Sequence, residues 1–458
     1  MPTPARVRSD RLGMLDVLRF VAAFAVIGFH FLARTSPAWG GAAPAETAGV
    51  GQWAAYGRLG VPLFFVISGF VILMSSWGKD VPAFAASRIG RLYPAYWISV
   101  VLSVAISFVL WPAYAEFFGG HGSPSDAVLN LTMVQQAFGA DSVSGVYWTL
   151  WYEARFYLLI ALLMLVGMTR GRVLAFAALW PVLGAVADEA GSDLLTTLLL
   201  PTYAPFFAGG MLLYVIYRDG HDLGTWLLVG LNAAIALHFS IAIHENALTK
   251  LTPFEPSTIV IAVLTLACFG LVAAATLTRA AHWNARWMVT AGALTYPVYL
   301  VHENLGWFVI AHLRTRIGAW GAVLAAVAVA LLAAWLLHRF VERPFGPRLR
   351  AVVLDMLRRT TSERARADER EPVEADFDEY ADAEYEDADL YEDERVATAA
   401  PAPRRPLVPP VVARHEPVER IEQWDDGDDW QEQTLVTSPM RLPRLDRDDA
   451  VGAGHPTR

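Results

Sequence analysis

Long apolar runs separated by short polar segments dominate the first three quarters of this 458-residue chain. A run of about 20 apolar residues is long enough to cross the hydrocarbon core of a bilayer as an α-helix. The pattern therefore predicts an all-α, polytopic membrane protein with about ten transmembrane helices. The runs of spanning length are 14–34, 58–76, 93–113, 148–168, 173–189, 198–217, 224–243, 257–278, 287–311 and 318–338.

Lys and Arg residues are distributed unevenly between the alternate segments that connect these runs. With the N-terminus inside, the inner segments carry fifteen of them. The outer segments carry three, with Arg34 and Arg58 at helix ends as borderline additions. Because positive residues concentrate on the cytoplasmic side, we expect a multi-pass protein of the cell membrane. Both termini, including residues 1–13, are then cytoplasmic.

The run from Leu15 to His30 is unusual because it carries an arginine and a histidine. Ionisable side chains are costly inside a membrane and are commonly functional. The steps from Arg19 to His30 amount to ~1100°, or three turns plus ~20°, so both side chains lie on one helix face. Asp16 is placed to pair with Arg19 at the i, i+3 spacing. Two structural alternatives stay open: an interfacial anchor for Arg19 and a packing role for His30.

Polar residues also interrupt the second run and precede the third. Ser68 and Gly69 permit close helix contact, which packing explains as well as function does. Arg88 and Arg91 lie three residues apart, on one face if that stretch is helical. A pair of guanidiniums on the predicted cytoplasmic side is suited to bind phosphate. Ordinary positive-inside anchoring is the alternative.

Two later runs carry ionisable residues as well. The fourth run opens with YWTLWYEARFY, in which Glu153 is an uncommon residue for an entering membrane helix. The ninth run contains TYPVYLVHENLGW, which places Thr295, Tyr299 and His302 on one face, with Glu303 next in line. Ionisable residues on separate membrane helices indicate a functional site, and pairing for structure alone is the alternative.

The C-terminal quarter has a different composition. Residues 345–458 have a formal net charge of −12, whereas residues 1–344 have +3. Such an acidic segment cannot bury a core, so we predict a disordered, acidic cytoplasmic tail over 345–458. It is a candidate segment for binding a protein partner, and a solvated extension without a specific partner is the alternative.

Composition also limits the chemistry. The single cysteine, Cys268, excludes an intramolecular disulfide and a thiolate metal cluster, and we expect no metal and no nucleic-acid partner. The chain lacks the GxxxxGKS or GxxxxGKT pattern, which excludes ATP-driven transport within it. A secondary transporter or flippase with a buried Arg, His and Glu pathway stays an alternative function, as does a scaffold that recruits partners through the tail.

Taken together, the motifs resemble those of the family-three membrane acyltransferases, which are bacterial integral-membrane O-acyltransferases. The ordered matches are Arg19 and His30 at the R-x10-H spacing, GVPLFFVISGF at 60–70, RIGRLYPAYW at 88–97, WTLWYEARFY at 148–157, YLVH at 299–302 and VERP at 341–344. Val17 and Leu18 occupy the place of a frequent glycine. Ala154 stands where a second glutamate is frequent, which argues against a two-carboxylate mechanism.

The resemblance implies that residues 14–344 form a transmembrane acyltransferase domain. Its reaction would move an acyl group, usually acetyl, from cytoplasmic acyl-CoA to a hydroxyl of a carbohydrate, a glycolipid or a secondary metabolite. Acyl-CoA would be a substrate, with no permanently bound cofactor. Histidine is suited to remove the hydroxyl proton, so His30 is the candidate base or, alternatively, the acyl carrier. Glu153 is the candidate to orient or charge-stabilise the His30 imidazole.

The remaining site candidates are substrate-binding residues in contact with the donor, the acceptor or the surrounding membrane lipids. Arg19 lies nearer the donor side than His30 because it comes earlier in a helix that starts in the cytoplasm. With the arginine pair it is a candidate for binding the phosphates of CoA. The full set is Arg19, Arg88, Arg91, Ser68, Tyr299 and His302.

Overall fold

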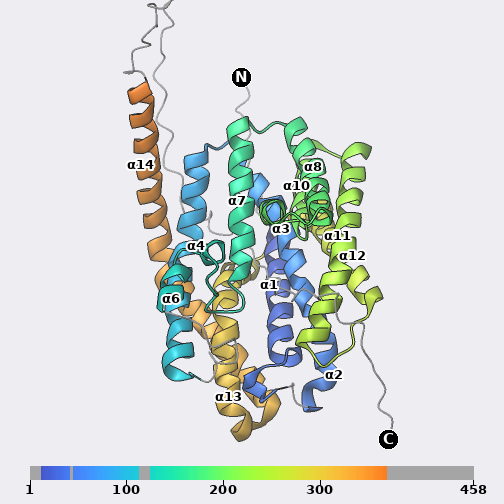
Figure 1. The fold of residues 1–458 in the computed structure, drawn as a ribbon, viewed down its shortest axis with the longest axis vertical. Helices are drawn as coiled ribbons and strands as arrows, with labels where there is room; N and C mark the ends of the chain where they lie inside the picture. The colour runs from blue at the N-terminus through green and yellow to red at the C-terminus, as the bar shows by residue number, and fades with distance from the viewer. Residues whose placement is uncertain (1–11, 42–44, 113–123, 369–458) are drawn as a thin grey trace, which may run out of the picture. The chain divides into compact units, whose positions relative to one another are not determined.

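The computed structural model of the protein describes residues 12–41, 45–112 and 124–368. These residues form helices joined by short connections, with one isolated bridge and no strand among them (Figure 1). The described residues up to Arg358 belong to one compact unit. Of a second unit, Arg359–Asp428, the structure describes only the end of the last helix. The prediction of an all-α protein is confirmed.

The helices have the following bounds. The α-helices are α1 (Gly13–Gly28), α2 (Ala45–Ala54), α3 (Gly60–Ser76), α4 (Val81–Val104), α6 (Pro124–Asn130), α7 (Trp148–Val166), α8 (Arg170–Glu189), α9 (Asp193–Leu199), α10 (Ala204–Asp219), α11 (Leu223–Leu251), α12 (Thr258–Leu277), α13 (Arg286–Leu337) and α14 (Arg343–Asp368). The shorter helical turns are η1 (Phe29–Ala33), η2 (Pro37–Trp39), η3 (Ala55–Leu59), η4 (Ala105–Leu110), η5 (Gln135–Phe138), η6 (Arg279–His282) and η7 (His338–Glu342).

The helix count agrees with the ten predicted runs. Nine helical stretches of the described residues are long and apolar enough to cross a membrane. The last of them begins at Arg286, and its α13 part contains two helical segments that meet at Gly318, where the backbone has φ 72° and ψ 173°. A positive φ is accessible to glycine without a steric penalty. When these two segments are counted separately, the described residues contain ten candidate membrane spans. The protein is a polytopic membrane protein.

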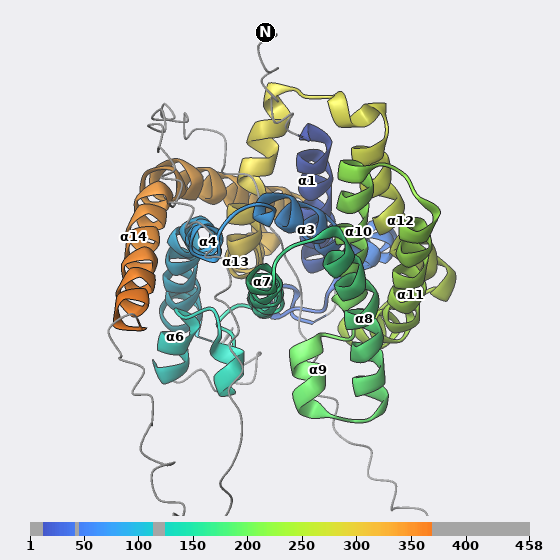
Figure 2. The same cartoon turned by 90° about the horizontal axis from the view of Figure 1, so that it is seen from above.

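Helices α3 and α10 lie at the centre of the unit, with α4 and α13 on one side and α8, α11 and α12 on the other (Figure 2). In the most apolar window of the span that ends with α3, 89% of the residues are buried, compared with 28% for α11. Gly69 of α3 faces the backbone of Phe207, and Gly210 of α10 faces the backbone of Val66. Small residues allow membrane helices to approach closely, so the predicted packing role of Gly69 is confirmed.

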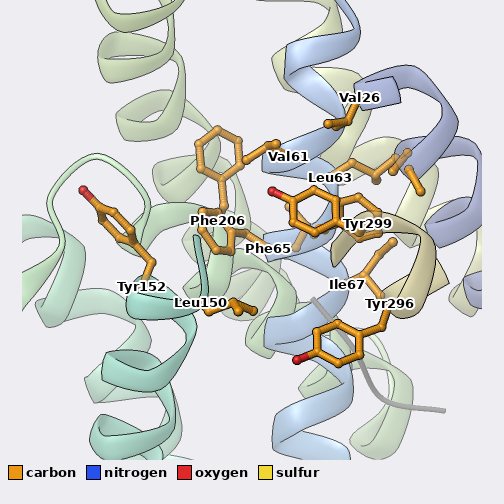
Figure 3. Packing of buried hydrophobic residues seen from close by; sticks show 14 of the residues in the cluster. Val26, Val61, Leu63, Phe65, Ile67, Leu150, Tyr152, Phe206, Tyr296 and Tyr299 are labelled. Atoms are coloured by element: carbon orange, nitrogen blue, oxygen red, sulfur yellow. The ribbon is translucent and has the colours of Figure 1, made fainter. Parts of the chain in front are cut away.

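Aromatic rings fill the space around this central pair. Phe207 of α10 lies 4.1 Å from both Phe65 and Phe156, measured between ring centroids. Tyr203 lies 5.0 Å from Phe65 and 4.9 Å from Tyr152. Figure 3 shows part of the same core, including side chains of α3, α10 and α13. This packing fixes the positions of the helices that carry the polar residues described next.

The start of the predicted tail differs from our expectation. Helix α14 runs from Arg343 to Asp368, so the prediction of disorder is wrong for residues 345–368. A Cβ at Gly90 of α4 would meet the Arg350 side chain at 2.7 Å, which shows that α14 packs closely on α4. Residues 369–458, the rest of the predicted tail, lie outside the described residues.

Candidate active site

His30 lies in η1, a single π-helical turn at the C-terminal end of α1. Its exposure is 1% and that of Arg19 is 3%, so both side chains face the protein interior as predicted. A π turn interrupts the α-helical hydrogen-bond pattern and is frequent at functional sites. The Trp307 indole donates to the His30 carbonyl oxygen and the Trp39 indole to that of Phe31, each at 3.0 Å. The two tryptophans therefore fix the backbone that carries His30.

The His30 ring contacts two consecutive residues of α13. Its Nδ1 is 3.1 Å from Nε2 of His302, and its Nε2 is 3.6 Å from Oε1 of Glu303. Nδ1 of His302 lies 2.7 Å from the carbonyl oxygen of Tyr299. A carbonyl oxygen only accepts, so His302 donates from Nδ1 and its neutral Nε2 accepts from Nδ1 of His30. The basic nitrogen of a neutral His30 is then Nε2, on the side of Glu303.

The carboxylate of Glu303 is fully buried and is contacted from several directions. Nη1 of Arg34 lies 2.7 Å from Oε1, and the Ser144 hydroxyl donates to Oε2 at 3.3 Å. A Cβ at Gly145 would be 2.6 Å from Oε1, so a larger residue there would displace the carboxylate. The Arg34 guanidinium also lies 5.1 Å from the centre of the Trp307 ring, a favourable cation–π distance. Glu303 is thus placed to stabilise positive charge on a protonated imidazole.

The structure does not place Glu153 beside His30, contrary to the predicted pairing. Glu153 is fully buried on α7, where the hydroxyl of Tyr157 donates to it. Helix α7 packs against α3 and α4, whereas α1 packs against α13. The carboxylate next to His30 therefore comes from α13, as Glu303, and not from α7.

Tyr299 lies between the two carboxylates. Its hydroxyl donates to the carbonyl oxygen of Val146 at 3.4 Å. It interacts electrostatically with Glu303 and with Glu153, and its backbone carbonyl accepts from His302. Tyr299 projects from α13 into the aromatic core (Figure 3). The structure therefore brings His302 to His30, and the carbonyl oxygen of Tyr299 orients the His302 ring.

Arg88 and Arg91 are both buried in α4. The guanidinium carbon of Arg88 lies 6.0 Å from the centre of the Tyr157 ring. Because the Tyr157 hydroxyl donates to Glu153, Arg88 belongs to the neighbourhood of Glu153 rather than to that of His30. Two separate polar clusters result, one around each glutamate.

Arg19 and Ser68 have different surroundings. Arg19 forms an ion pair with Asp16 at 3.4 Å within α1, as the i, i+3 spacing predicted. Asp16 fits against Gly292 of α13, where a Cβ would lie 2.5 Å from Oδ1. This contact ties the first turns of α1 to α13. Ser68 is buried in α3 next to Gly69.

Sequence reasoning missed three residues of the His30 cluster. Glu303 follows His302 directly and was noted only as the next residue in line. Arg34 is four residues after His30, a spacing that brings helical side chains together, but the charge count above uses it only as a borderline outer charge at a helix end. Ser144 lies before α7 without any sequence signal. No group of three or more His, Cys, Asp and Glu side chains among the described residues is arranged to bind a metal ion.

Comparisons with known proteins identify the family of this chain. Residues 13–339 match a family described as "Acyltransferase domain". The chain belongs to this acyltransferase family. The match confirms the resemblance that the ordered motifs indicated, and it covers all the candidate residues around His30 and Glu153.

Curated relatives have similar names. The chain is 27% identical over 195 residues to the putative peptidoglycan O-acetyltransferase YrhL of Bacillus subtilis, across 38% of this chain and 27% of the relative. It is 28% identical over 171 residues to the peptidoglycan O-acetyltransferase OatA of Listeria monocytogenes, across 33% and 24%. A putative acetyltransferase of Acidianus two-tailed virus, ORF330, is 27% identical over 172 residues, across 36% and 50%. The matches thus span a quarter to a half of each relative's length. No solved structure matches the chain.

Proposed function

We propose that this protein is a membrane O-acyltransferase that moves an acyl group, acetyl in the first instance, from acyl-CoA to a hydroxyl of a cell-envelope carbohydrate or glycolipid. The observation that carries the proposal is the buried His30 ring, hydrogen-bonded to His302 and facing the ion pair of Glu303 and Arg34. The family gives the reaction class. The names of the relatives, peptidoglycan O-acetyltransferases, favour an envelope glycan as acceptor.

The hydrogen-bond chain through the two histidines supports Nε2 of His30 as the base. Nε2 of His302 accepts a hydrogen bond from Nδ1 of His30, and Nδ1 of His302 donates to the carbonyl oxygen of Tyr299. Nε2 of His30 therefore takes the proton of the acceptor hydroxyl. The imidazolium that forms lies 3.6 Å from Glu303, whose negative charge stabilises it. A histidine base that neighbouring groups orient and charge-stabilise is also used in other acyl transfers that involve a hydroxyl.

Bond changes follow from that assignment. The acceptor oxygen attacks the thioester carbonyl as its proton passes to His30, and a tetrahedral intermediate forms. The carbon–sulfur bond then breaks, the ester is released, and the thiolate of CoA takes the proton from the imidazolium. In the alternative order, Nε2 of His30 displaces the thiolate of CoA and carries the acyl group; the acceptor oxygen then takes the acyl group, and its proton ends on the thiolate. Both orders use the same nitrogen, and both end with neutral His30.

The arginine pair of α4 marks the side of the protein at which we propose that acyl-CoA binds. With the N-terminus in the cytoplasm, α4 starts there as well, and Arg88 and Arg91 lie roughly 10 and 15 Å along it. His30 lies ~25 Å along α1, near the opposite side of a ~30 Å hydrocarbon layer. We propose that the pair binds phosphates of CoA, aided by Arg19, and that the pantetheine arm carries the thioester toward His30.

The test is acyl transfer by the purified protein in detergent or nanodiscs. Acetyl-CoA should be consumed with release of CoA, and addition of an envelope extract should accelerate release and yield an acetylated product by mass spectrometry. His30→Ala should reduce both by about 1000-fold or more, as loss of a catalytic base does in related chemistry. Acetyl-CoA binding by His30→Ala should be unchanged. Acyl transfer at the wild-type rate by a folded His30→Ala protein would overturn the mechanism.

A further inference from the structure

A second arginine lies buried beside the candidate active site, and the proposed reaction leaves it without a role. Arg58 belongs to η3, the turn that leads into α3, and is 5% exposed. Its Nη1 lies 2.9 Å from Nδ1 of His244 on α11. A guanidinium only donates, so Nδ1 of His244 accepts and the ring is neutral with its proton on Nε2. The pair therefore retains the full positive charge of the arginine.

The surroundings of Arg58 do not neutralise this charge. Among the residues that the structure describes, no carboxylate forms an ion pair with Arg58. Its electrostatic neighbours are Tyr203, Arg34 and His30. Arg34, by contrast, is paired with Glu303 at 2.7 Å. Because buried charges are normally paired, a guanidinium in this position is suited to receive an anion from outside the protein.

The position of Arg58 is tied to the helix that carries His30. Glycines at 57 and 60 flank it, and both lie against the backbone of α1. A Cβ at Gly60 would be 2.6 Å from the carbonyl oxygen of Ala22, and one at Gly57 would overlap that of Ala25. Ala25 precedes His30 by about 1.4 helical turns. These backbone contacts fix the position of Arg58 relative to His30.

We propose that Arg58, oriented by His244, binds an anionic group of the acceptor, a carboxylate or a phosphate, while the acceptor hydroxyl lies at His30. The assignment rests on the proposed function and narrows its acceptor from carbohydrates and glycolipids in general to acidic ones. His244 acts as a positioning residue because it touches the guanidinium and not the acceptor. The planar fork of arginine fits both carboxylate and phosphate oxygens.

The experiment uses membranes that contain the full-length protein, radiolabelled acetyl-CoA and total envelope material. Products are separated by anion exchange into acidic and neutral fractions. Mass spectrometry of the acidic fraction then distinguishes carboxylated from phosphorylated acceptors. The label should appear in the acidic fraction, and Arg58→Gln should reduce it about 10- to 100-fold, the range expected for a lost hydrogen bond to a charged group. Arg316→Gln, which removes an exposed arginine, is the matched control and should retain wild-type transfer.

A second measurement separates acceptor binding from a general role in catalysis. Release of CoA without acceptor should be the same in Arg58→Gln and wild type, as should the KM for acetyl-CoA. His244→Gln, whose amide oxygen can accept from Arg58, should retain transfer, and His244→Leu should lose it about tenfold. If Arg58→Gln does not accumulate, Arg58→Lys replaces it, with reduced transfer to acidic acceptors and unchanged CoA release.

The outcomes are distinguishable. Label in the neutral fraction, unchanged transfer by Arg58→Gln, or an equal loss of transfer and of acceptor-free CoA release would each overturn the assignment of Arg58 and leave the proposed function standing. If the wild-type protein neither labels any fraction nor releases CoA, the proposed function is wrong and the assignment is wrong with it.

Discussion

Replacement of Glu303 by glutamine tests whether the carboxylate from α13 supports the base. The substitution keeps the shape of the side chain and removes its charge. In the proposed reaction His30 becomes positively charged only as the acceptor hydroxyl loses its proton. An interaction with Glu303 therefore favours the transition state over the ground state, and its loss should appear in kcat rather than in KM.

The magnitude follows from the distance. Unit charges 3.6 Å apart interact with about 4.6 kcal/mol at an effective dielectric constant of about 20. Arg34 is paired with the same carboxylate and opposes part of that stabilisation. We therefore expect Glu303→Gln to raise the barrier by about 2.7 to 4 kcal/mol, which corresponds to a 100- to 1000-fold lower kcat.

The assay compares CoA release and product formation in purified variants. Removing one member of a buried ion pair destabilises a protein by about 3–5 kcal/mol, so loss of fold has to be separated from loss of catalysis. The double variant Arg34→Gln plus Glu303→Gln leaves no unbalanced charge and should recover thermal stability without recovering kcat. More than a third of the wild-type kcat in a folded Glu303→Gln protein would refute the role assigned to the carboxylate.

Glu153→Gln is the matched control, because it removes an equally buried carboxylate that lies in the cluster of Tyr157 and Arg88. It should raise the KM for acetyl-CoA several-fold and lower kcat much less than Glu303→Gln does. If Glu153→Gln instead lowered kcat more than Glu303→Gln does, the result would support the pairing of Glu153 with His30 that the sequence predicted.

Three further predictions concern other parts of the chain. Arg88→Ala with Arg91→Ala should raise the KM for acetyl-CoA by at least about tenfold, because charge-assisted hydrogen bonds to the phosphates of CoA are lost; an unchanged KM in kinetic titrations would contradict phosphate binding. Truncation after residue 368 should leave transfer in membranes nearly unchanged, whereas removal of α14 should reduce the yield of inserted protein, as measured by immunoblot; equal yields would show that the contact with α4 is dispensable. Lys79→Cys should react with an impermeant maleimide only after permeabilisation and Phe138→Cys should react in intact cells, because the native cysteine is buried; the opposite labelling would invert the topology.

The sequence predicted the features that depend on local geometry. Arg19 and Asp16 pair within one helix turn, Tyr299 and His302 share a face, and Gly69 permits close packing because it lacks a side chain. These relations require only the periodicity of a helix. The ten membrane spans could likewise be predicted from the length of the apolar runs and the thickness of a membrane. Each run therefore lies near a helix of the structure.

The features that depend on which helices are neighbours could not be predicted. Glu153 and Glu303 are equally unusual in membrane helices, and nothing in their local sequence says which helix docks beside α1. The structure shows that α13 is the helix that packs beside α1, because Gly292 of α13 accommodates Asp16 of α1. The same limit applies to residues 345–368, whose helix packs closely on α4 at Gly90. Net charge summed over the whole tail concealed this basic first part.

The π turn at His30 has a consequence for the length of the first helix. Such a turn contains one residue more than the α-helical pattern would use, so the residues in it are offset from the helical phase of α1. Arg19 and Asp16 lie in the regular part of α1, whereas the π turn holds His30 and ends before Arg34, where the backbone becomes extended and the side chain reaches Glu303. A residue added to or removed from the ten between Arg19 and His30 would rotate His30 by about 100° relative to Arg19. Such a change would turn the imidazole away from α13 even if every side chain in the cluster were kept.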